Sequence, residues 1–139
     1  RAMIGGNGHM ADVAGLIELA RSRCLTDDPR VRQELAAAYT RDEILRFLGY
    51  RSRTALAHGR PPGPETSITK LFMAGHLAGM GSLGKALEGA DGLLVGEHDA
   101  RLRTWRFLYA PSIGIAGGTN EVQRSIIGER VLGLPRGPK

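Results

Sequence analysis

The sequence is poor in cysteine and has no long apolar run. Its one cysteine, Cys24, cannot form a disulfide within the chain, and no tandem Cys/His spacing typical of a zinc site is present. We therefore expect that neither disulfides nor a zinc site hold the fold together. A chain of this kind suits a reducing cytoplasm. No apolar segment approaches the ~20 residues that span a bilayer, and the N-terminus lacks the charged start and apolar segment of a signal peptide. The expected location is cytoplasmic, without a membrane.

Aromatic residues make up only 5% of the sequence and β-branched residues are also few, whereas Ala, Leu, Arg and Glu are plentiful. This composition favours helices over strands. A length of 139 residues fits one domain with a single hydrophobic core. The predicted fold class is all-α.

The formal net charge of +5 raises the question of nucleic acid. Lys and Arg are scattered among Asp and Glu, so the clustered basic footprint of a nucleic-acid-binding protein is missing. A basic helical nucleic-acid-binding domain therefore ranks last among the functions that we consider.

Apolar residues recur at three- and four-residue steps, which predicts amphipathic helices. The predicted helices span residues 10–23, 29 to the break at 59–64, 65–94, 100–108 and 120–132. Asp28 followed by Pro29 is a strong start signal, and the glycines and prolines of residues 59–64 end the second helix. Helices joined by short breaks imply an antiparallel bundle.

Polar and glycine residues interrupt the apolar stripes of the second and third helices. Each glycine in an exposed helix costs about 1 kcal/mol relative to alanine, so the third helix is expected to combine close packing with a break. The glycines concerned are Gly75, Gly79, Gly81 and Gly84. Asp42 is expected at the solvated edge of the second helix's stripe, because a buried carboxylate needs a partner.

A glycine loop stands before the last predicted helix, where residues 117–123 read GGTNEVQ. Two glycines let the backbone approach a neighbour closely, and Thr119 or Asn120 can cap the following helix. Free N–H groups at such a helix start can also hold a phosphate or a polar ribose edge. Spacing alone favours plain capping, which is common, and leaves the binding role open.

The wider string is more specific. Residues 115–136, which read IAGGTNEVQRSIIGERVLGLPR, closely resemble the terminal signature of acyl-CoA dehydrogenases. Upstream, GRPPGPE at 59–65 and SITKL at 67–71 resemble a helix break and the next helix start of many bacterial members. The resemblance covers nearly the whole chain, more loosely before Asp28. It implies that residues 1–139 are a C-terminal four-helix bundle lengthened by a closing helix, with the N-terminal helical and middle β-domains lying outside these residues.

By this resemblance FAD lies between the domains, and Gly118, Thr119 and Glu121 meet its adenosine side. The family's reaction removes the proton next to the thioester carbonyl and transfers hydride from the next carbon to the flavin, which requires a placed carboxylate. Many members keep that glutamate directly before the Gly-Thr pair, where this chain has Gly117. Glu121 lies two residues beyond the pair and is a poor candidate for the same role.

Other family members carry the glutamate on the first bundle helix, immediately before an arginine. In our interpretation Arg1 corresponds to that arginine, so that Arg1 lies near the acyl-CoA and the catalytic glutamate directly precedes it. The other possibility is a catalytically silent subunit that pairs with an active one.

The chain departs from the family pattern at two places. The Arg-x-Phe-Gly stretch that contacts a neighbouring subunit's flavin is absent near residues 21–26, and residues 89–94 stand roughly where a Gln-x-x-Gly-Gly segment is expected. These departures concern the inter-subunit half of the flavin site rather than the fold.

The remaining candidates are assigned to packing or to solvent. The histidines show no pairing at metal spacing and are expected at surface or interface positions: His9, His58, His76 and His98. The aromatic residues of the fourth helix are expected in the core or an interface: Trp105, Phe107 and Tyr109. Lys70 and Arg124 are candidates to meet phosphates, but solvated helix faces are the simpler expectation for both.

The sequence therefore predicts part of a FAD-dependent acyl-CoA dehydrogenase of lipid metabolism, inactive as residues 1–139 alone. The implied partners are an acyl-CoA substrate, an acceptor resembling electron-transfer flavoprotein, and further subunits in a homo- or hetero-oligomer, as a dimer or tetramer. No nucleic acid, membrane or metal is expected. The alternative is a non-catalytic oligomerisation or partner subunit of such an enzyme.

Overall fold

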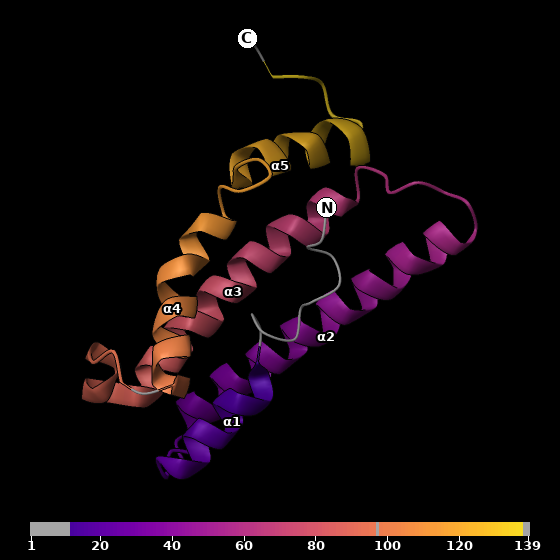
Figure 1. The fold of residues 1–139 in the computed structure, drawn as a ribbon. Helices are drawn as coiled ribbons and strands as arrows, with labels where there is room; N and C mark the ends of the chain where they lie inside the picture. Colours follow the sequence, from indigo (N-terminus) through magenta and orange to yellow (C-terminus); the bar gives the residue numbers. More distant parts are fainter. Residues whose placement is uncertain (1–11, 97, 138–139) are drawn as a thin grey trace.

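The computed structural model describes residues 12–96 and 98–137, and the regular elements found there are helical (Figure 1). In chain order they are α1 (Val13–Ser22), α2 (Pro29–Ala57), α3 (Thr66–Glu88), the 3-10 turn η2 (Gly89–Leu93), α4 (His98–Ile113), α5 (Asn120–Ile126) and the short π-helical segment η3 (Ile127–Val131). The predicted all-α fold class is confirmed.

The helices form an antiparallel bundle around α3. Figure 1 shows α2 and α4 running antiparallel to α3 on its two sides, while α1 packs against α2 and α3. The main core cluster lies where α1, α2 and α3 meet and consists of Val13, Leu16, Ala20, Ala38, Met80, Leu83 and Leu87. The last helix, α5, crosses the N-terminal end of α3. The predicted bundle with an added C-terminal helix is confirmed.

The predicted start and stop signals of α2 act as expected. The Asp28 side chain accepts a hydrogen bond from the backbone N–H of Arg30 at 2.8 Å, and Pro29 is the first helical residue. Pro29 costs nothing there, because the first turn of a helix has no intrahelical acceptor for its N–H groups. After α2 ends, Gly59 takes a left-handed conformation (φ +70°) that closes the helix before the prolines.

Three predicted helix ends differ from the structure. α3 ends at Glu88, six residues before Leu94, because Gly89 turns left-handed (φ +61°) and opens η2. α4 continues through Pro111 to Ile113 rather than ending at Leu108; a proline in the last turn removes one helical hydrogen bond and leaves the rest intact. α5 gives way to the π-helical η3 at Ile127 instead of continuing to Leu132.

The glycines of α3 divide into two pairs. A Cβ added to Gly81 would lie 2.9 Å from the Cα of Phe107, and one added to Gly84 would lie 3.4 Å from the Leu16 side chain. The predicted close packing is therefore confirmed for this pair. Added Cβ atoms at Gly75 and Gly79 would meet nothing within 4 Å, and α3 has no break at these glycines, so the prediction was wrong there.

A buried ion cluster joins the end of α3 to α4. The carboxylate of Glu88, whose side chain is 2% exposed, accepts hydrogen bonds from Lys85 Nζ at 2.7 Å and from Arg103 Nε at 2.5 Å. Lys85 also donates to the Thr104 hydroxyl at 2.6 Å. Burial alone raises the pKa of Glu88, but the hydrogen bonds and charges of Lys85 and Arg103 outweigh burial and hold this pKa below its usual value.

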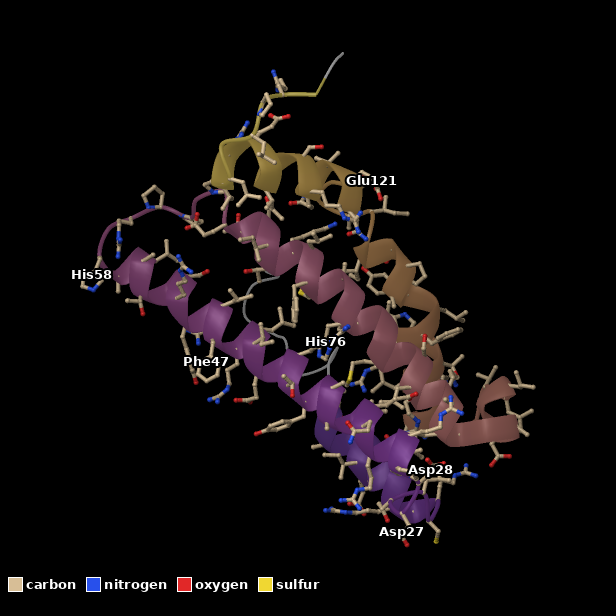
Figure 2. All side chains as sticks on the ribbon, turned by 180° about the vertical axis from the view of Figure 1, so that it is seen from behind. Asp27, Asp28, Phe47, His58, His76 and Glu121 are labelled. Carbon is tan, nitrogen blue, oxygen red and sulfur yellow. The ribbon has the colours of Figure 1, made fainter. Side chains whose placement is uncertain are left out.

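His76 is buried rather than placed at the surface, which corrects the prediction for this residue. It lies on α3 and faces α2, where its Nε2 stands 3.6 Å from Asp42 Oδ1 (Figure 2). That distance exceeds a hydrogen bond. Burial lowers the pKa of His76, although the nearby Asp42 opposes the shift. Asp42 itself lies at the predicted edge of the α2 stripe, with its side chain 44% exposed.

We expect Gly81→Ala to lower the free energy of unfolding by about 1–3 kcal/mol, because the new methyl group would collide with the α4 backbone. Gly75→Ala is the matched control: its methyl group meets open space, so it should raise the same quantity by about 0.5–1 kcal/mol. Urea denaturation of the two variants and the unchanged chain measures the difference. Equal stability of the two variants would contradict the close approach of α3 and α4.

We expect Glu88→Gln to lower the free energy of unfolding by about 2–3 kcal/mol near neutral pH, because Lys85 and Arg103 lose their counter-charge but keep some contact with water. The pKa of Glu88 is lower in the folded protein than in the unfolded chain. The carboxylate therefore contributes to the free energy of unfolding at pH values above its unfolded pKa, and this contribution is lost as the pH falls through its folded pKa. The stability gap between the two proteins should therefore narrow on acidification below about pH 4.5. A gap that stays constant from pH 7 to strong acid would contradict this account.

Candidate functional site

The candidate site is the glycine loop of residues 114–119, which connects α4 to α5. Gly117 (φ +69°) and Gly118 (φ +99°) are both in conformations that favour glycine, and they lie in the turn that leads from α4 into α5. Thr119 then caps α5, because its Oγ1 accepts a hydrogen bond from the N–H of Val122 at 3.4 Å. The prediction that Thr119 or Asn120 caps this helix is confirmed for Thr119.

Two side chains hold the loop from the inside by its carbonyl groups. Lys70 Nζ, from α3, donates to the carbonyl oxygens of Gly118 at 2.6 Å and of Gly114 at 3.2 Å. Gln123 Nε2, from α5, donates to the carbonyl oxygen of Gly117 at 3.0 Å, and the Gln123 side chain is buried. The prediction that Lys70 lies on a solvated helix face was therefore wrong.

These carbonyl contacts fix the direction of the neighbouring N–H groups. The described chain has no cis peptide bond, so the C=O of one residue and the N–H of the next point in opposite directions. With the Gly117 and Gly118 carbonyls turned toward Gln123 and Lys70, the N–H groups of Gly118 and Thr119 point away from those side chains. Within the part of the chain that the structure describes, neither N–H group donates to a protein acceptor.

Glu121 places a negative charge on the outer side of the same loop (Figure 2). Its side chain is 78% exposed and pairs with Arg124 at 3.4 Å. Its own backbone N–H, and then the Thr119 side chain, hold the pKa of this carboxyl below its usual value. Glu121 is therefore a hydrogen-bond acceptor that stays ionised, and Arg124 lies on a solvated face as predicted.

Sequence reasoning missed the roles of the two side chains that hold the loop carbonyls, Lys70 and Gln123. Asn120 was assigned only to capping; its buried Oδ1 has no hydrogen-bond partner among the described residues. Arg1 and His9 lie outside the described residues, as does the side chain of His98.

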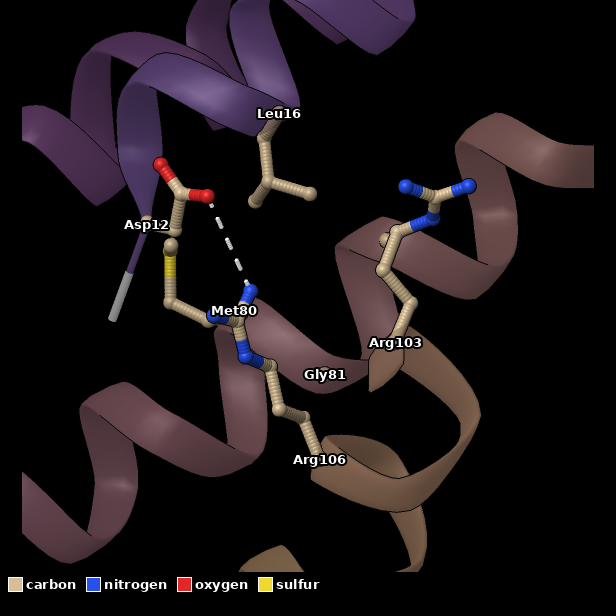
Figure 3. A pocket seen from close by; sticks show the side chains of 7 residues that line it. Asp12, Leu16, Met80, Gly81, Arg103 and Arg106 are labelled. Atoms are coloured by element: carbon tan, nitrogen blue, oxygen red, sulfur yellow. Dashed lines mark ion pairs between the residues drawn. The ribbon is translucent and has the colours of Figure 1, made fainter. Parts of the chain in front are cut away.

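Two pockets that share Leu16, Arg103 and Arg106 lie beside α1, and the larger, between α1 and α4, has a volume of about 400 Å³. The cavity between α1, α3 and α4 has a volume of about 20 Å³, and an ion pair between Arg106 and Asp12, 3.8 Å apart, lies beside it (Figure 3). That volume suits one water molecule. The described residues contain no cluster of three or more side chains that could hold a metal ion, and none of their helices is both long and apolar enough to cross a bilayer.

Two aromatic residues of α4, Trp105 and Tyr109, lie one turn apart on an exposed face of the helix, whereas Phe107 has its Cα next to Gly81 of α3. Trp105 and Tyr109 stack with ring centroids 4.8 Å apart and an interplanar angle of 11°. Both rings and Phe107 are exposed, so the prediction of core positions was wrong for residues 1–139. An interface role for this face stays a prediction.

Comparison with known proteins identifies the family. The model for the acyl-CoA dehydrogenase C-terminal domain matches residues 2–132. Acyl-CoA dehydrogenase IpdE1 of Mycobacterium tuberculosis is 35% identical over 130 residues, which are 92% of this chain and 33% of that protein. IpdE1 of Mycolicibacterium smegmatis is 34% identical over 125 residues, which are 88% of this chain and 30% of that protein. The chain thus spans about a third of the length of these relatives.

Solved structures share the fold. The structure described as Tcur3481-Tcur3483 steroid ACAD superposes with a TM-score of 0.80 and 22% identity, over 90% of this chain and 34% of that one. A chain of the ChsE4-ChsE5 complex from Mycobacterium tuberculosis superposes with a TM-score of 0.73 and 23% identity, over 92% of this chain and 38% of that one. The chain belongs to the acyl-CoA dehydrogenase family, as its C-terminal domain.

We expect Gly118→Ala to destabilise the domain more than Gly117→Ala. Both positions have positive φ, which costs an alanine about 1 kcal/mol. Only at Gly118 would the new Cβ also collide, at 2.9 Å from Gln123 Nε2, whereas at Gly117 it meets nothing within 4 Å. The expected losses in the free energy of unfolding are about 1 kcal/mol for Gly117→Ala and about 2–3 kcal/mol for Gly118→Ala. Chemical denaturation measures both, and equal losses would contradict the inward placement of Gln123.

Proposed function

We propose that residues 1–139 are the C-terminal helical domain of a FAD-dependent acyl-CoA dehydrogenase. Such an enzyme introduces a double bond between the α- and β-carbons of an acyl-CoA thioester. The loop at 114–119 carries the proposal, because it lies within the family match and presents, beside an ionised carboxylate, two N–H groups with no acceptor among the described residues. The N-terminal helical and middle β-domains of such an enzyme lie outside residues 1–139, so these residues alone are expected to be inactive.

The loop suits the adenosine side of FAD. Adenine nitrogens and phosphate oxygens accept hydrogen bonds, which the N–H groups of Gly118 and Thr119 can donate. Ribose hydroxyls donate hydrogen bonds, which the carboxylate of Glu121 can accept. Gly118 also leaves the backbone uncovered, so that a ligand can approach it closely. Bound FAD supplies the acceptor for the hydride that leaves the β-carbon.

The catalytic base of the proposed reaction lies outside this loop. Gly117 has no side chain, and Glu121 is a weak base because its pKa is lowered. We therefore keep the proposal that the base is a glutamate directly before Arg1 and that Arg1 lies near the acyl-CoA. The sequence immediately upstream of Arg1 in the full-length protein tests this assignment, since an apolar or basic residue there would reject it.

The proposed enzyme works as an oligomer and passes its electrons to an acceptor resembling electron-transfer flavoprotein. One similar structure is described as a complex of two differently named components, ChsE4 and ChsE5, which supports a hetero-oligomer in particular. The exposed aromatic face of α4 is a surface that such assembly would cover.

A catalytically silent partner subunit is the second candidate. One observation favours it: Gly117 stands where many family members keep their base. A silent subunit would still need the bundle fold, and it would associate with an active member of the family.

Reconstitution of the full-length protein tests the two candidates. We expect it to purify with bound flavin, recognised by absorbance near 450 nm, and to lose that absorbance when acyl-CoA is added without oxygen. The panel should contain straight-chain, branched and steroid-bearing acyl-CoA thioesters, because one similar structure is described as a steroid ACAD. Residues 1–139 alone serve as the inactive control.

The outcomes separate the candidates. Flavin that is reduced by an acyl-CoA supports the enzyme. A colourless protein that forms a stoichiometric complex with an active homologue supports the silent subunit. A colourless protein that associates with no family member rejects both.

A further inference from the structure

We propose that Lys70 is a positioning residue that sets the conformation of the 114–119 loop and, through it, the affinity of the enzyme for FAD. The inference rests on the proposed function, because FAD is the ligand that the loop is proposed to meet. It concerns a residue of α3 that lies more than 40 positions away in sequence from the carbonyl groups it contacts.

One cation ties the two ends of the loop together. Gly114 directly follows α4 and Gly118 directly precedes the cap of α5, and both carbonyl oxygens accept from Lys70 Nζ. Hydrogen bonds to a charged donor are roughly twice as strong as neutral ones. The 2.6 Å bond to Gly118 is shorter than the usual distance for such a pair, which fits a charged donor aimed at this oxygen.

The loop needs such a contact because its glycines are conformationally free. A glycine adopts positive and negative φ with similar ease, so rotation about the backbone bonds of Gly117 and Gly118 can swing the Gly118 carbonyl away from Lys70 at low cost. Rotation would turn the Gly118 carbonyl outward and the Thr119 N–H inward. Lys70 prevents it, because the outward rotation would break its bond to Gly118. The outward direction of the Thr119 N–H therefore depends on Lys70.

Gln123 performs the same task for the preceding peptide. Its Nε2 holds the Gly117 carbonyl at 3.0 Å, which directs the N–H of Gly118 outward. Each of the two N–H groups proposed to meet FAD is thus oriented by one internal side chain. Lys70 is the more informative one to change, because it lies on α3 and leaves the sequence of the loop and α5 intact.

A purely structural role for Lys70 is the competing explanation, and α3 offers a matched control. Lys85 is also partly buried on α3, and its Nζ also donates to two acceptors, Glu88 and Thr104. Its contacts join α3 to α4 and include no residue of the loop. Lys85→Met therefore also removes two hydrogen bonds of a partly buried lysine, one of them to a carboxylate, without touching the 114–119 loop.

The experiment compares Lys70→Met, Lys70→Arg and Lys85→Met in the full-length enzyme. For each, the apoprotein is titrated with FAD, the dissociation constant is read from flavin fluorescence, and the thermal midpoint is recorded. We expect both methionine variants to lower the thermal midpoint. Only Lys70→Met should weaken FAD binding, by about tenfold or more, since it removes two charge-assisted hydrogen bonds that hold the loop. Lys70→Arg keeps a charged donor and should bind FAD more tightly than Lys70→Met.

Three results would overturn the inference: a Lys70→Met dissociation constant within about twofold of the unchanged enzyme, an equal loss in Lys85→Met, or Lys70→Arg binding no better than Lys70→Met. If Lys70→Met does not fold, Lys70→Gln replaces it with the same expectations, because glutamine is uncharged and too short to reach both carbonyls. If the unchanged full-length protein binds no FAD, the proposed function itself fails. The inference about Lys70 fails on its own only where the unchanged enzyme binds FAD normally.

Discussion

The close approach of α3 to α4 is the constraint on which the rest of the structure depends. A side chain at position 81 would meet the backbone of α4, so glycine there sets the distance between the two helices. The ion cluster of Glu88 then joins the same pair of helices at the C-terminal end of α3. Because α4 runs antiparallel to α3, the loop that follows α4 lies at the N-terminal end of α3. That is where Lys70 meets it.

The loop shows how a glycine-rich segment acquires one conformation. Its glycines permit the turn from α4 into α5, but they favour no single arrangement of the peptide groups. The arrangement is selected by donors that come from outside the loop, Lys70 on α3 and Gln123 on α5. Helix α3 is positioned by its packing in the hydrophobic core. Through Lys70, it thereby determines which backbone groups of the loop face outward. The fold and the candidate site are coupled through Lys70.

Much of the fold could be predicted because its signals are local. Asp28 with Pro29 starts a helix by satisfying free N–H groups, and Gly59 ends it by turning left-handed, whatever the rest of the chain does. The failures concern residues whose role depends on a distant segment. Lys70 is polar and was assigned to solvent, yet its acceptors lie on a loop more than 40 residues away. His76 was assigned to the surface in the same way, although α2 covers it. The spacing of residues along one helix does not show which residues of a neighbouring segment lie against them.

In the proposed enzyme, the loop around Gly117 serves to bind FAD, and the catalytic base comes from another segment. A Cβ at this position would meet nothing within 4 Å, so crowding within the described chain does not explain the absence of a side chain. The φ of +69° does favour glycine, and it belongs to the turn in which Gln123 holds the Gly117 carbonyl. A glutamate here would strain the conformation that orients the N–H of Gly118. Under the proposed function, a loop optimised to present Gly118 and Thr119 gains from a base that another segment supplies.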